Sequence, residues 1–329
     1  MHDIKTDIKN NIYSNMYILT GTENFLIDFY TKEVLKANSE EDTADFNVMK
    51  ISKELPSVEE IDAFANSYPF MSEKKVMVIQ STGIFKKVSE EQKEFWTGLV
   101  SNTPDYLIVV FAETEIDKRN AIYKAISQRY PVCEFNYREI GELASWLKKI
   151  FSSGGKKISN QDAAYMAEIA GPSMFSLKSE AEKIISYCAD TDTITTEIIN
   201  SLVTRSIENK VFDMVDDMVN GKPSVGMIKL NDLKALNEEP IKIISIIFKK
   251  LSGLHKLIIL KNRPMREISA LTGLYESRIR SNMSQANKLG AVRIANVMIK
   301  CKDMDSAIKN GLTDKWLAVE LILSEIICK

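Results

Sequence analysis

The stretch Met16-Tyr-Ile-Leu-Thr-Gly-Thr-Glu-Asn-Phe-Leu-Ile27 decides the fold class. It opens with a short apolar run, which is typical of a buried strand, and from Glu23 onward it places apolar side chains at helical spacing. A buried strand that leads through a short loop into a helix is the first half of a βαβ unit, and the strand that follows such a helix is expected to run parallel to the first.

The same alternation continues over the first 138 residues. Short runs rich in Val and Ile predict the strands, and amphipathic patterns between them predict the helices. The predicted strands are Met16–Leu19, Phe46–Met49, Val76–Ile79, Leu107–Phe111 and Val132–Phe135, and the predicted helices are Glu23–Lys36, Val58–Asn66, Glu90–Val100 and Lys118–Gln128. This order predicts an α/β domain with a parallel sheet over residues 1–138.

The strand signals stop at Glu139, and the rest of the chain is predicted to be helical. Residues 139–206 are predicted to form a small helical domain, with helices at Glu139–Phe151, Ser159–Ala170, Met174–Cys188 and Thr193–Leu202. Residues 207–329 are predicted to form a second, all-α domain. Within it Ile241–Lys261 is apolar nearly all round, so we expect a central buried helix there.

The composition of the 329 residues, 45% apolar and 27% charged, is that of a globular protein and excludes disordered, collagen-like and disulfide-scaffold classes. The net charge of −2 is unevenly spread, since residues 207–329 carry 20 basic and 14 acidic side chains and residues 1–206 carry 23 and 31. The polar first residues do not form a signal peptide, and lysines interrupt the longest apolar run. We therefore expect a cytoplasmic protein without a membrane span.

Cysteine and histidine are too sparse for a metal site. The four cysteines are far apart, there is no Cys-x-x-Cys pair, and only two histidines are present. We expect free buried thiols, as in a reducing cytosol, and neither a metal nor a cofactor. The cysteines are Cys133, Cys188, Cys301 and Cys328.

The loop after the first strand lacks the residues that bind nucleotide phosphates. A phosphate loop needs a glycine-rich turn followed by Gly-Lys-Ser/Thr, but Thr20–Ile27 has only Gly21, has no lysine, and carries Glu23, which would repel phosphate. The strand Leu107–Phe111 is followed by Ala112 and Glu113, without the aspartate that would hold magnesium. We therefore expect no ATP hydrolysis and no intrinsic catalysis.

Seven segments in order along the chain resemble one family. They are Tyr17–Ile27, Tyr68–Ile79, Leu107–Phe111, Glu115–Arg119, Glu208–Lys222, Asn237–Ile241 and Asp303–Gly311. Together they cover nearly the whole chain and resemble the delta subunit of the bacterial DNA polymerase III clamp loader. Each motif alone is an apolar pattern with a few charges, and the specificity lies in their order and spacing.

The resemblance implies a fold and a function. The fold would be an AAA+-like α/β domain with a degenerate nucleotide site, a helical lid domain over 139–206 and a helical collar domain over 207–329. The chain would bind the sliding clamp and open it for loading onto primed DNA during replication. Its partners would be the clamp, the other clamp-loader subunits (gamma/tau and delta prime) and primed DNA in the assembled complex, with no membrane involved. Sister subunits would bind and hydrolyse ATP.

The segment Tyr68-Pro-Phe-Met71 matches the family's clamp-contacting segment. Pro69 ends helical continuation after Val58–Asn66, so Phe70 and Met71 are expected at a loop tip before the charged residues 72–75. An aromatic ring beside a flexible thioether is a suitable anchor for a hydrophobic pocket, although the same residues could fold back onto the domain's own core. Some family members carry Met and Leu where this chain has Ser67 and Pro69.

The region from Lys261 to Lys302 is strongly basic, with nine basic residues against Glu267 and Glu276. A surface of this kind can lie near DNA phosphates, but a solvated face with ion pairs between subunits explains the charges equally well. The DNA-proximal candidates are Lys261, Arg263, Arg266, Arg278, Arg280 and Lys288. Asp216 and Asp217 are interpreted as surface charges, because adjacent helical side chains point about 100° apart.

Two other functions remain open at this point. The chain could be an active AAA+-type ATPase with an atypical phosphate loop, which tight ATP binding would indicate. It could also be a standalone DNA-binding protein that uses its basic C-terminal domain, which salt-dependent DNA binding by the isolated chain would indicate.

Overall fold

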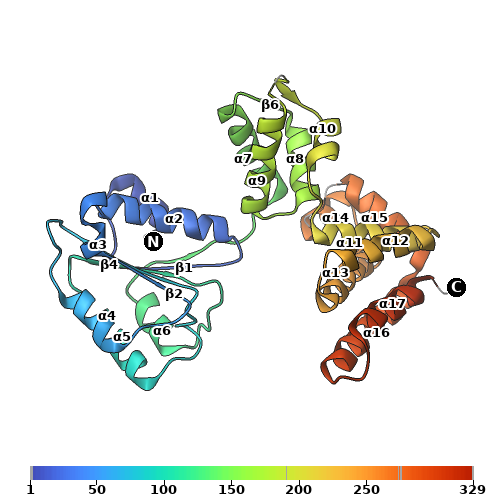
Figure 1. Cartoon of the computed structure of the whole chain (residues 1–329). Helices are drawn as coiled ribbons and strands as arrows, with labels where there is room; N and C mark the ends of the chain where they lie inside the picture. The colour runs from blue at the N-terminus through green and yellow to red at the C-terminus, as the bar shows by residue number, and fades with distance from the viewer. Residues whose placement is uncertain (1–2, 190, 273, 275, 328–329) are drawn as a thin grey trace. The chain divides into compact units, whose positions relative to one another are not determined.

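The structure is a computed structural model that describes residues 3–189, 191–272, 274 and 276–327. The described residues form two compact units (Figure 1). The first comprises the chain up to Ala167 together with Pro172–Ile199, and the second comprises Glu168–Gly171 together with the chain from Asn200 onward. The division into three domains at residues 138 and 206 stays a prediction.

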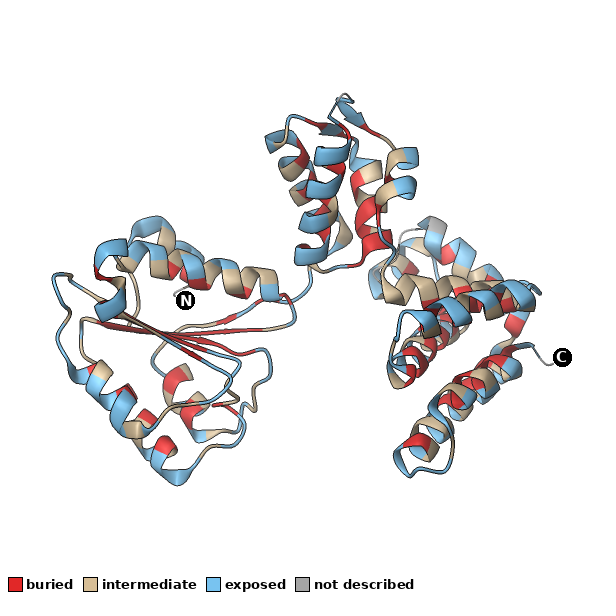
Figure 2. Cartoon of the chain, viewed as in Figure 1, coloured by how far each residue is buried: buried red, intermediate tan, exposed pale blue. Residues whose placement is uncertain are grey.

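The first unit is built on a five-stranded sheet in which all strands are parallel, in the order β2-β3-β4-β1-β5. The strands are β1 Met16–Thr20, β2 Val48–Ser52, β3 Lys75–Gln80, β4 Leu107–Ala112 and β5 Val132–Glu134. This confirms the predicted α/β fold. β3, β4 and β1 lie in the middle of the sheet and are buried along almost their whole length (Figure 2).

Helices cover both faces of this sheet. Side chains along a strand alternate between faces, so Tyr17 and Leu19 pack on one side and Met16 and Ile18 on the other. The first face is covered by α1 and α2, and the second by α4, α5 and α6 (Figure 1). The elements are α1 Ile4–Asn10, α2 Asn24–Asn38, η1 Glu41–Thr43, α3 Ala44–Asn47, α4 Val58–Asn66, α5 Glu90–Ser101 and α6 Ala121–Ser127.

β2 begins later than its sequence pattern predicts. Phe46 and Asn47 end the short helix α3 instead of opening the strand, and the pairing with β3 runs from Val48 to Ser52. The physical reason is that the buried Asn47 side chain bonds to the backbone of a neighbouring loop, at Phe70. The predicted strand Phe46–Met49 is therefore split. The ring of Phe46 is exposed at the surface, and the strand begins only at Val48.

The helices after the sheet are α7 Ile140–Ser153, α8 Asn160–Ala170, α9 Met174–Tyr187 and α10 Thr196–Leu202. They lie close to their predicted ranges. The expectation that no strand follows Glu139 is wrong, since β6 Lys157–Ile158 pairs in parallel with β7 Thr193–Ile194. Strands of two residues are too short to produce a periodic pattern, so sequence analysis could not detect them.

The second unit is all helical. It contains α11 Ile207–Val219, α12 Pro223–Ala235, α13 Pro240–Leu260, α14 Met265–Thr272, α15 Glu276–Leu289, α16 Ala291–Lys309 and α17 Lys315–Ile327. α13 packs against α11, α15, α16 and α17, and Ile243, Ile247 and Leu251 lie in its core. The predicted central helix is therefore confirmed, although its residues Phe248 and Ile259 are exposed.

Three of the four cysteines are free and buried, namely Cys133, Cys188 and Cys301, while Cys328 lies outside the described residues. Burial raises the pKa of the Cys301 thiol to about 12, which disfavours the thiolate that binds metals. The described part of the chain holds no cluster of His, Cys, Asp or Glu suited to a metal ion. None of its helices combines the length and apolar character needed to cross a membrane.

Candidate functional site

The loop after β1 is closed by the chain's own backbone. Gly21 has φ +119°, and a Cβ at this position would lie 2.1 Å from the carbonyl oxygen of Phe135. The Glu23 amide donates to the same carbonyl at 2.9 Å. Because Gly21 has no side chain, the loop can lie close to the segment after β5. The Glu23 amide of the loop is already hydrogen-bonded within the fold.

A buried carboxylate occupies the position where a phosphate loop would hold phosphate, the N-terminus of the helix after the first strand. Glu23 is 1% exposed and is the N-cap of α2, where its Oε1 accepts from the Phe25 amide at 3.0 Å. Its Oε2 accepts from the Met174 amide at 3.1 Å, at the start of α9. One negative side chain thus satisfies amides at two helix N-termini, where negative charge is favourable.

Aromatic rings pack beside this carboxylate. Phe25 on α2 meets Trp146 of α7 and Phe175 of α9 edge to face, with ring centroids 5.5 and 5.2 Å apart. Together with Glu23, these rings join the sheet-covering helix α2 to the helices that follow the sheet.

The acidic residue after β4 is also used within the fold. Glu113 is 4% exposed, and its Oε1 accepts from the amide and the hydroxyl of Thr82 at 2.6 and 2.8 Å. The Gly83 amide donates to it as well, at 3.3 Å. This carboxylate therefore holds the loop after β3 through hydrogen bonds to Thr82 and Gly83.

The segment Tyr68–Met71 lies on the surface between α4 and β3. Tyr68 is 84% exposed, Phe70 51% and Met71 78%, while Pro69 is half-buried. Met71 has φ +50°, a left-handed conformation that costs a residue other than glycine roughly 1–2 kcal/mol. These residues stand outside the domain's core, and we call them the tip segment.

A buried asparagine fixes the backbone of the tip segment. Asn47 is 1% exposed, and its Oδ1 accepts from the Phe70 amide while its Nδ2 donates to the Phe70 carbonyl, both at 2.8 Å. Two bonds from one side-chain amide to one residue hold that residue in a single orientation. The ring of Phe70 is thereby presented at the surface, where it packs on the exposed ring of Phe46 at a centroid distance of 4.9 Å.

A buried lysine holds the start of the tip segment. Lys75, the first residue of β3, donates from Nζ to the Phe64 carbonyl at 2.9 Å and to the Ser67 hydroxyl at 2.5 Å. The same ammonium lies 4.0 Å from the centre of the Phe64 ring. Burial lowers the pKa of Lys75, and the ammonium is favourably placed near the C-terminal carbonyls of α4.

The structure places the predicted basic residues in the second unit, around the end of α13 and along α14 and α15. All six are exposed, but three of them have partners within the chain. Arg263 pairs with Glu267, Arg280 pairs with Glu276 at 3.5 Å, and Lys288 donates to Asn220 at 2.7 Å. The other three are Lys261, Arg266 and Arg278.

The sequence left open whether Phe70 and Met71 project from a loop tip or fold back onto the core, and it did not point to Phe46 and Asn47 at all. Both lay inside a run that predicted a strand, and they are 24 and 23 positions from Phe70 in the chain. A local signal existed only for Asn47, because a polar side chain inside an apolar run is costly to bury without a partner.

Comparison with known proteins agrees with this fold. Residues 17–136 match the family described as DNA polymerase III, delta subunit, and residues 208–326 match the family described as the C-terminal domain of the same subunit. The chain is 23% identical to DNA polymerase III subunit delta of Bacillus subtilis strain 168, over 99% of this chain and 96% of that protein.

Solved structures resemble the chain as well. Bacillus subtilis DNA clamp loader delta protein matches with a TM-score of 0.53 and 20% identity over 98% of both chains. The Thermotoga maritima RuvB Holliday junction branch migration motor matches more weakly, with a TM-score of 0.45 and 13% identity over 72% of this chain and 78% of that one.

The fold, a parallel α/β domain followed by helices, is therefore similar to that of the Bacillus subtilis clamp loader delta protein. Because models of the same subunit match two parts that together make up well over half of the sequence, the chain belongs to the family of DNA polymerase III delta subunits.

Proposed function

We propose that this chain binds the sliding clamp through its tip segment and opens the clamp for loading onto primed DNA. The observation that carries the proposal is the half-exposed Phe70, whose backbone amide and carbonyl both bond to the buried side chain of Asn47. Ordering the anchor before binding reduces the entropy cost of association, which favours affinity. A solvent-exposed aromatic anchor with an ordered backbone has no evident role in the domain's own stability.

The strained backbone of Met71 supports the same proposal. Residues held in sparsely populated backbone conformations cluster at functional sites, where the surrounding structure maintains them. Met71 is exposed beside Phe70, and its flexible thioether can adapt to the surface of a partner.

The chain acts in this proposal without catalysis of its own. The N-terminus of α2 is occupied by the Glu23 carboxylate, and that loop has no lysine for the outer phosphates. We infer that ATP is bound and hydrolysed by sister subunits of the assembled complex. An ATPase assay on the purified chain should show no turnover above that of a mock purification.

The C-terminal helical unit is proposed to join the sister subunits and to lie near DNA in the assembled complex. The exposed basic residues at the end of α13 and along α14 and α15 support this placement, since they would be favourable near phosphates. They are Lys261, Arg263, Arg266, Arg278, Arg280 and Lys288.

The test of the clamp proposal is co-purification of the full chain with the cognate sliding clamp. We expect a stable complex on size-exclusion chromatography that requires no nucleotide. If the two proteins elute separately at micromolar concentration, with the chain shown to be folded, the proposal is wrong.

A further inference from the structure

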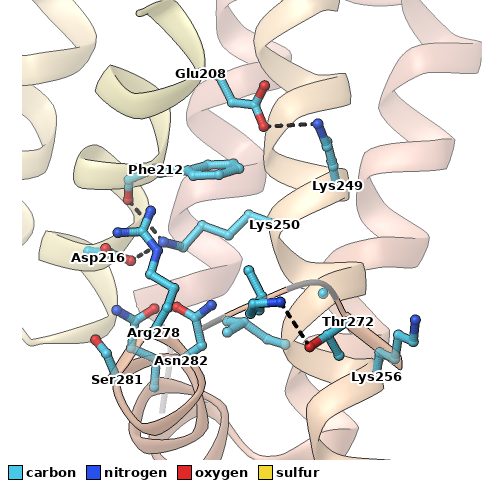
Figure 3. Close-up of a pocket in the computed structure, with 14 residues that line it drawn as sticks. Glu208, Phe212, Asp216, Lys249, Lys250, Lys256, Thr272, Arg278, Ser281 and Asn282 are labelled. Atoms are coloured by element: carbon cyan, nitrogen blue, oxygen red, sulfur yellow. Dashed lines mark hydrogen bonds and ion pairs between the residues drawn. The ribbon is translucent and has the colours of Figure 1, made fainter. Parts of the chain in front are cut away.

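A cavity of about 400 Å³ lies among the helices of the second unit (Figure 3). Its wall is formed mainly by α11, α13 and α15, which pack against one another. The volume falls within the range of small-molecule sites, and the wall combines apolar residues with a few convergent polar groups. The cavity is separate from the tip segment, which belongs to the first unit.

The charged groups that line the cavity are mostly basic. Four cations face two carboxylates, so the lining has a net charge of +2. Glu208 pairs with Lys249 at 3.0 Å, and the Lys256 ammonium donates to the Leu271 carbonyl at 2.7 Å. The remaining charged groups are Asp216, Lys250 and Arg278.

Within the cavity lining, Lys250 and Arg278 both lie near the carboxylate of Asp216 (Figure 3). Lys250, with a side chain only 7% exposed, pairs with Asp216 and donates to the Phe212 carbonyl at 3.3 Å. The Arg278 guanidinium turns toward the same place (Figure 3) and has no ion-pair partner among the residues that the structure describes. Burial lowers the pKa of Lys250, and nearby Arg278 adds to this while Asp216 opposes it.

A buried acceptor lines the same cavity. Gln285 is 8% exposed, and its Oε1 has no hydrogen-bond partner in the described part of the chain. A buried polar atom without a partner costs roughly 1–3 kcal/mol. The lining of the cavity thus combines a cation without an ion-pair partner in the described residues, Arg278, with a buried polar side chain, Gln285.

We propose that this cavity binds a small phosphomonoester that carries hydroxyl groups, of the size of a sugar phosphate. A phosphomonoester has a charge of roughly −1.5 to −2 at pH 7, which complements the net charge of the lining. The guanidinium of Arg278 donates in parallel to two phosphate oxygens, a geometry that arginine favours. A ligand hydroxyl pairs with the side-chain amide of Gln285, which lines the cavity, and the Phe212 ring forms an apolar wall.

The experiment is isothermal titration of the full chain with ribose 5-phosphate, inorganic phosphate and ribose as separate probes. We expect one molecule of ribose 5-phosphate per chain, bound at least tenfold more tightly than either inorganic phosphate or ribose. Arg278→Gln should weaken this binding about tenfold or more, because a charge-assisted pair is lost. Gln285→Leu should also weaken the binding of ribose 5-phosphate. Because glutamine is neutral, this substitution leaves no buried charge unpaired.

Arg280→Gln is the matched control, since Arg280 lies on the same helix, pairs with Glu276 and does not line the cavity. It should bind ribose 5-phosphate as the wild type does. The proposal is overturned if ribose 5-phosphate does not bind at millimolar concentration, if inorganic phosphate binds equally well, or if Arg280→Gln weakens binding as much as Arg278→Gln. Displacement of the bound sugar phosphate by an oligonucleotide without terminal phosphates would also overturn it in favour of a nucleic-acid contact. None of these outcomes depends on the clamp.

Discussion

At the scale of single residues, the tip segment separates groups that hold the backbone from groups that are presented to solvent. The buried Asn47 bonds to the segment, and the buried Lys75 bonds to Phe64 and Ser67 just before it. Phe70 and Met71 are exposed. Substitutions on the two sides should therefore have different effects. Removing a presented side chain should affect binding, and removing a buried support should affect both binding and stability.

Phe70→Ala should weaken clamp binding strongly while leaving the melting temperature nearly unchanged. A buried aromatic anchor at an interface typically costs about 2 kcal/mol or more on truncation, which is roughly thirtyfold in affinity. In the free chain this ring is 51% exposed, so its loss removes little core packing. The affinity is measured by surface plasmon resonance with immobilised clamp, and the stability by thermal unfolding.

Lys74→Ala is the control for Phe70→Ala. The Lys74 ammonium donates to the Asp105 carbonyl at 2.8 Å at the surface, and charges at the rim of an interface mainly tune the association rate. It should therefore change affinity much less than Phe70→Ala. A sharp fall in melting temperature for Phe70→Ala would instead indicate a core role, and unchanged affinity would place the anchor elsewhere.

Asn47→Ala should lower both the free energy of unfolding and the affinity for the clamp. The substitution removes both bonds to the Phe70 peptide and leaves buried groups unpaired, which costs roughly 1–3 kcal/mol. It also releases the backbone that presents the anchor, so binding must then order it again. Chemical denaturation and clamp titration measure the two effects. Wild-type affinity together with lowered stability would show that Asn47 supports the fold alone.

At the scale of elements, a side chain of the chain itself, Glu23, caps the N-terminus of α2, the helix that follows the first strand. Backbone amides at a helix N-terminus need acceptors, which a bound phosphate would otherwise supply. Here the acceptor is the Glu23 carboxylate, and its second oxygen reaches the first amide of α9. The Glu23 carboxylate therefore links the N-terminus of α2 to the N-terminus of α9.

Glu23→Ala should lower the free energy of unfolding by about 1–3 kcal/mol, because one N-cap and one buried bond are lost together. It should not create ATP hydrolysis, since the loop still lacks a lysine for the phosphates. Chemical denaturation and an ATPase assay measure the two outcomes. Glu94→Ala, at an exposed position on α5, is the control and should unfold like the wild type. Equal stability of the two variants would contradict a stabilising role for the link that Glu23 forms between α2 and α9.

At the scale of the whole molecule, the chain passes between the two compact units three times, after residues 167, 171 and 199. Glu168–Gly171 belongs to the second unit, where the Ile169 carbonyl accepts from the Ser206 amide at 2.9 Å and the Glu168 carbonyl accepts from the Asn209 side chain at 2.6 Å. The two family matches fall on separate parts of the chain in the same way, at residues 17–136 and 208–326.

A chain that ends at Arg205 should still bind the clamp but fail to join the other loader subunits. It keeps the tip segment with its supports and lacks helices α11 to α17, which we assign to the collar. Size-exclusion chromatography with the clamp and with the other subunits tests both parts. The full-length Phe70→Ala variant should behave in the opposite way, joining the loader without holding the clamp. Incorporation of the truncated chain at the wild-type level would refute the assignment of the collar.

Patterns in the sequence were enough to predict the order of strands and helices, the parallel α/β class and the lack of a phosphate-loop motif, because each depends on residues close together in the chain. Hydrophobic periodicity reports which face of an element is buried, and a missing lysine is visible in a motif of a few residues. Local chemistry also indicated a loop after Val58–Asn66, since Pro69 ends the helix there, but it left open whether Phe70 and Met71 face solvent or the core.

The contacts between these elements could be seen only in the three-dimensional structure. It placed Phe46 and Asn47 beside Phe70, joined Glu23 to an amide 151 positions away, and turned Arg278 toward the buried Lys250. It also divided the run Phe46–Met49 between a helix end and a strand. The physical reason is that periodicity specifies a buried face but not its partner. Partners are selected by packing and hydrogen bonding between segments distant in sequence, which no local pattern encodes.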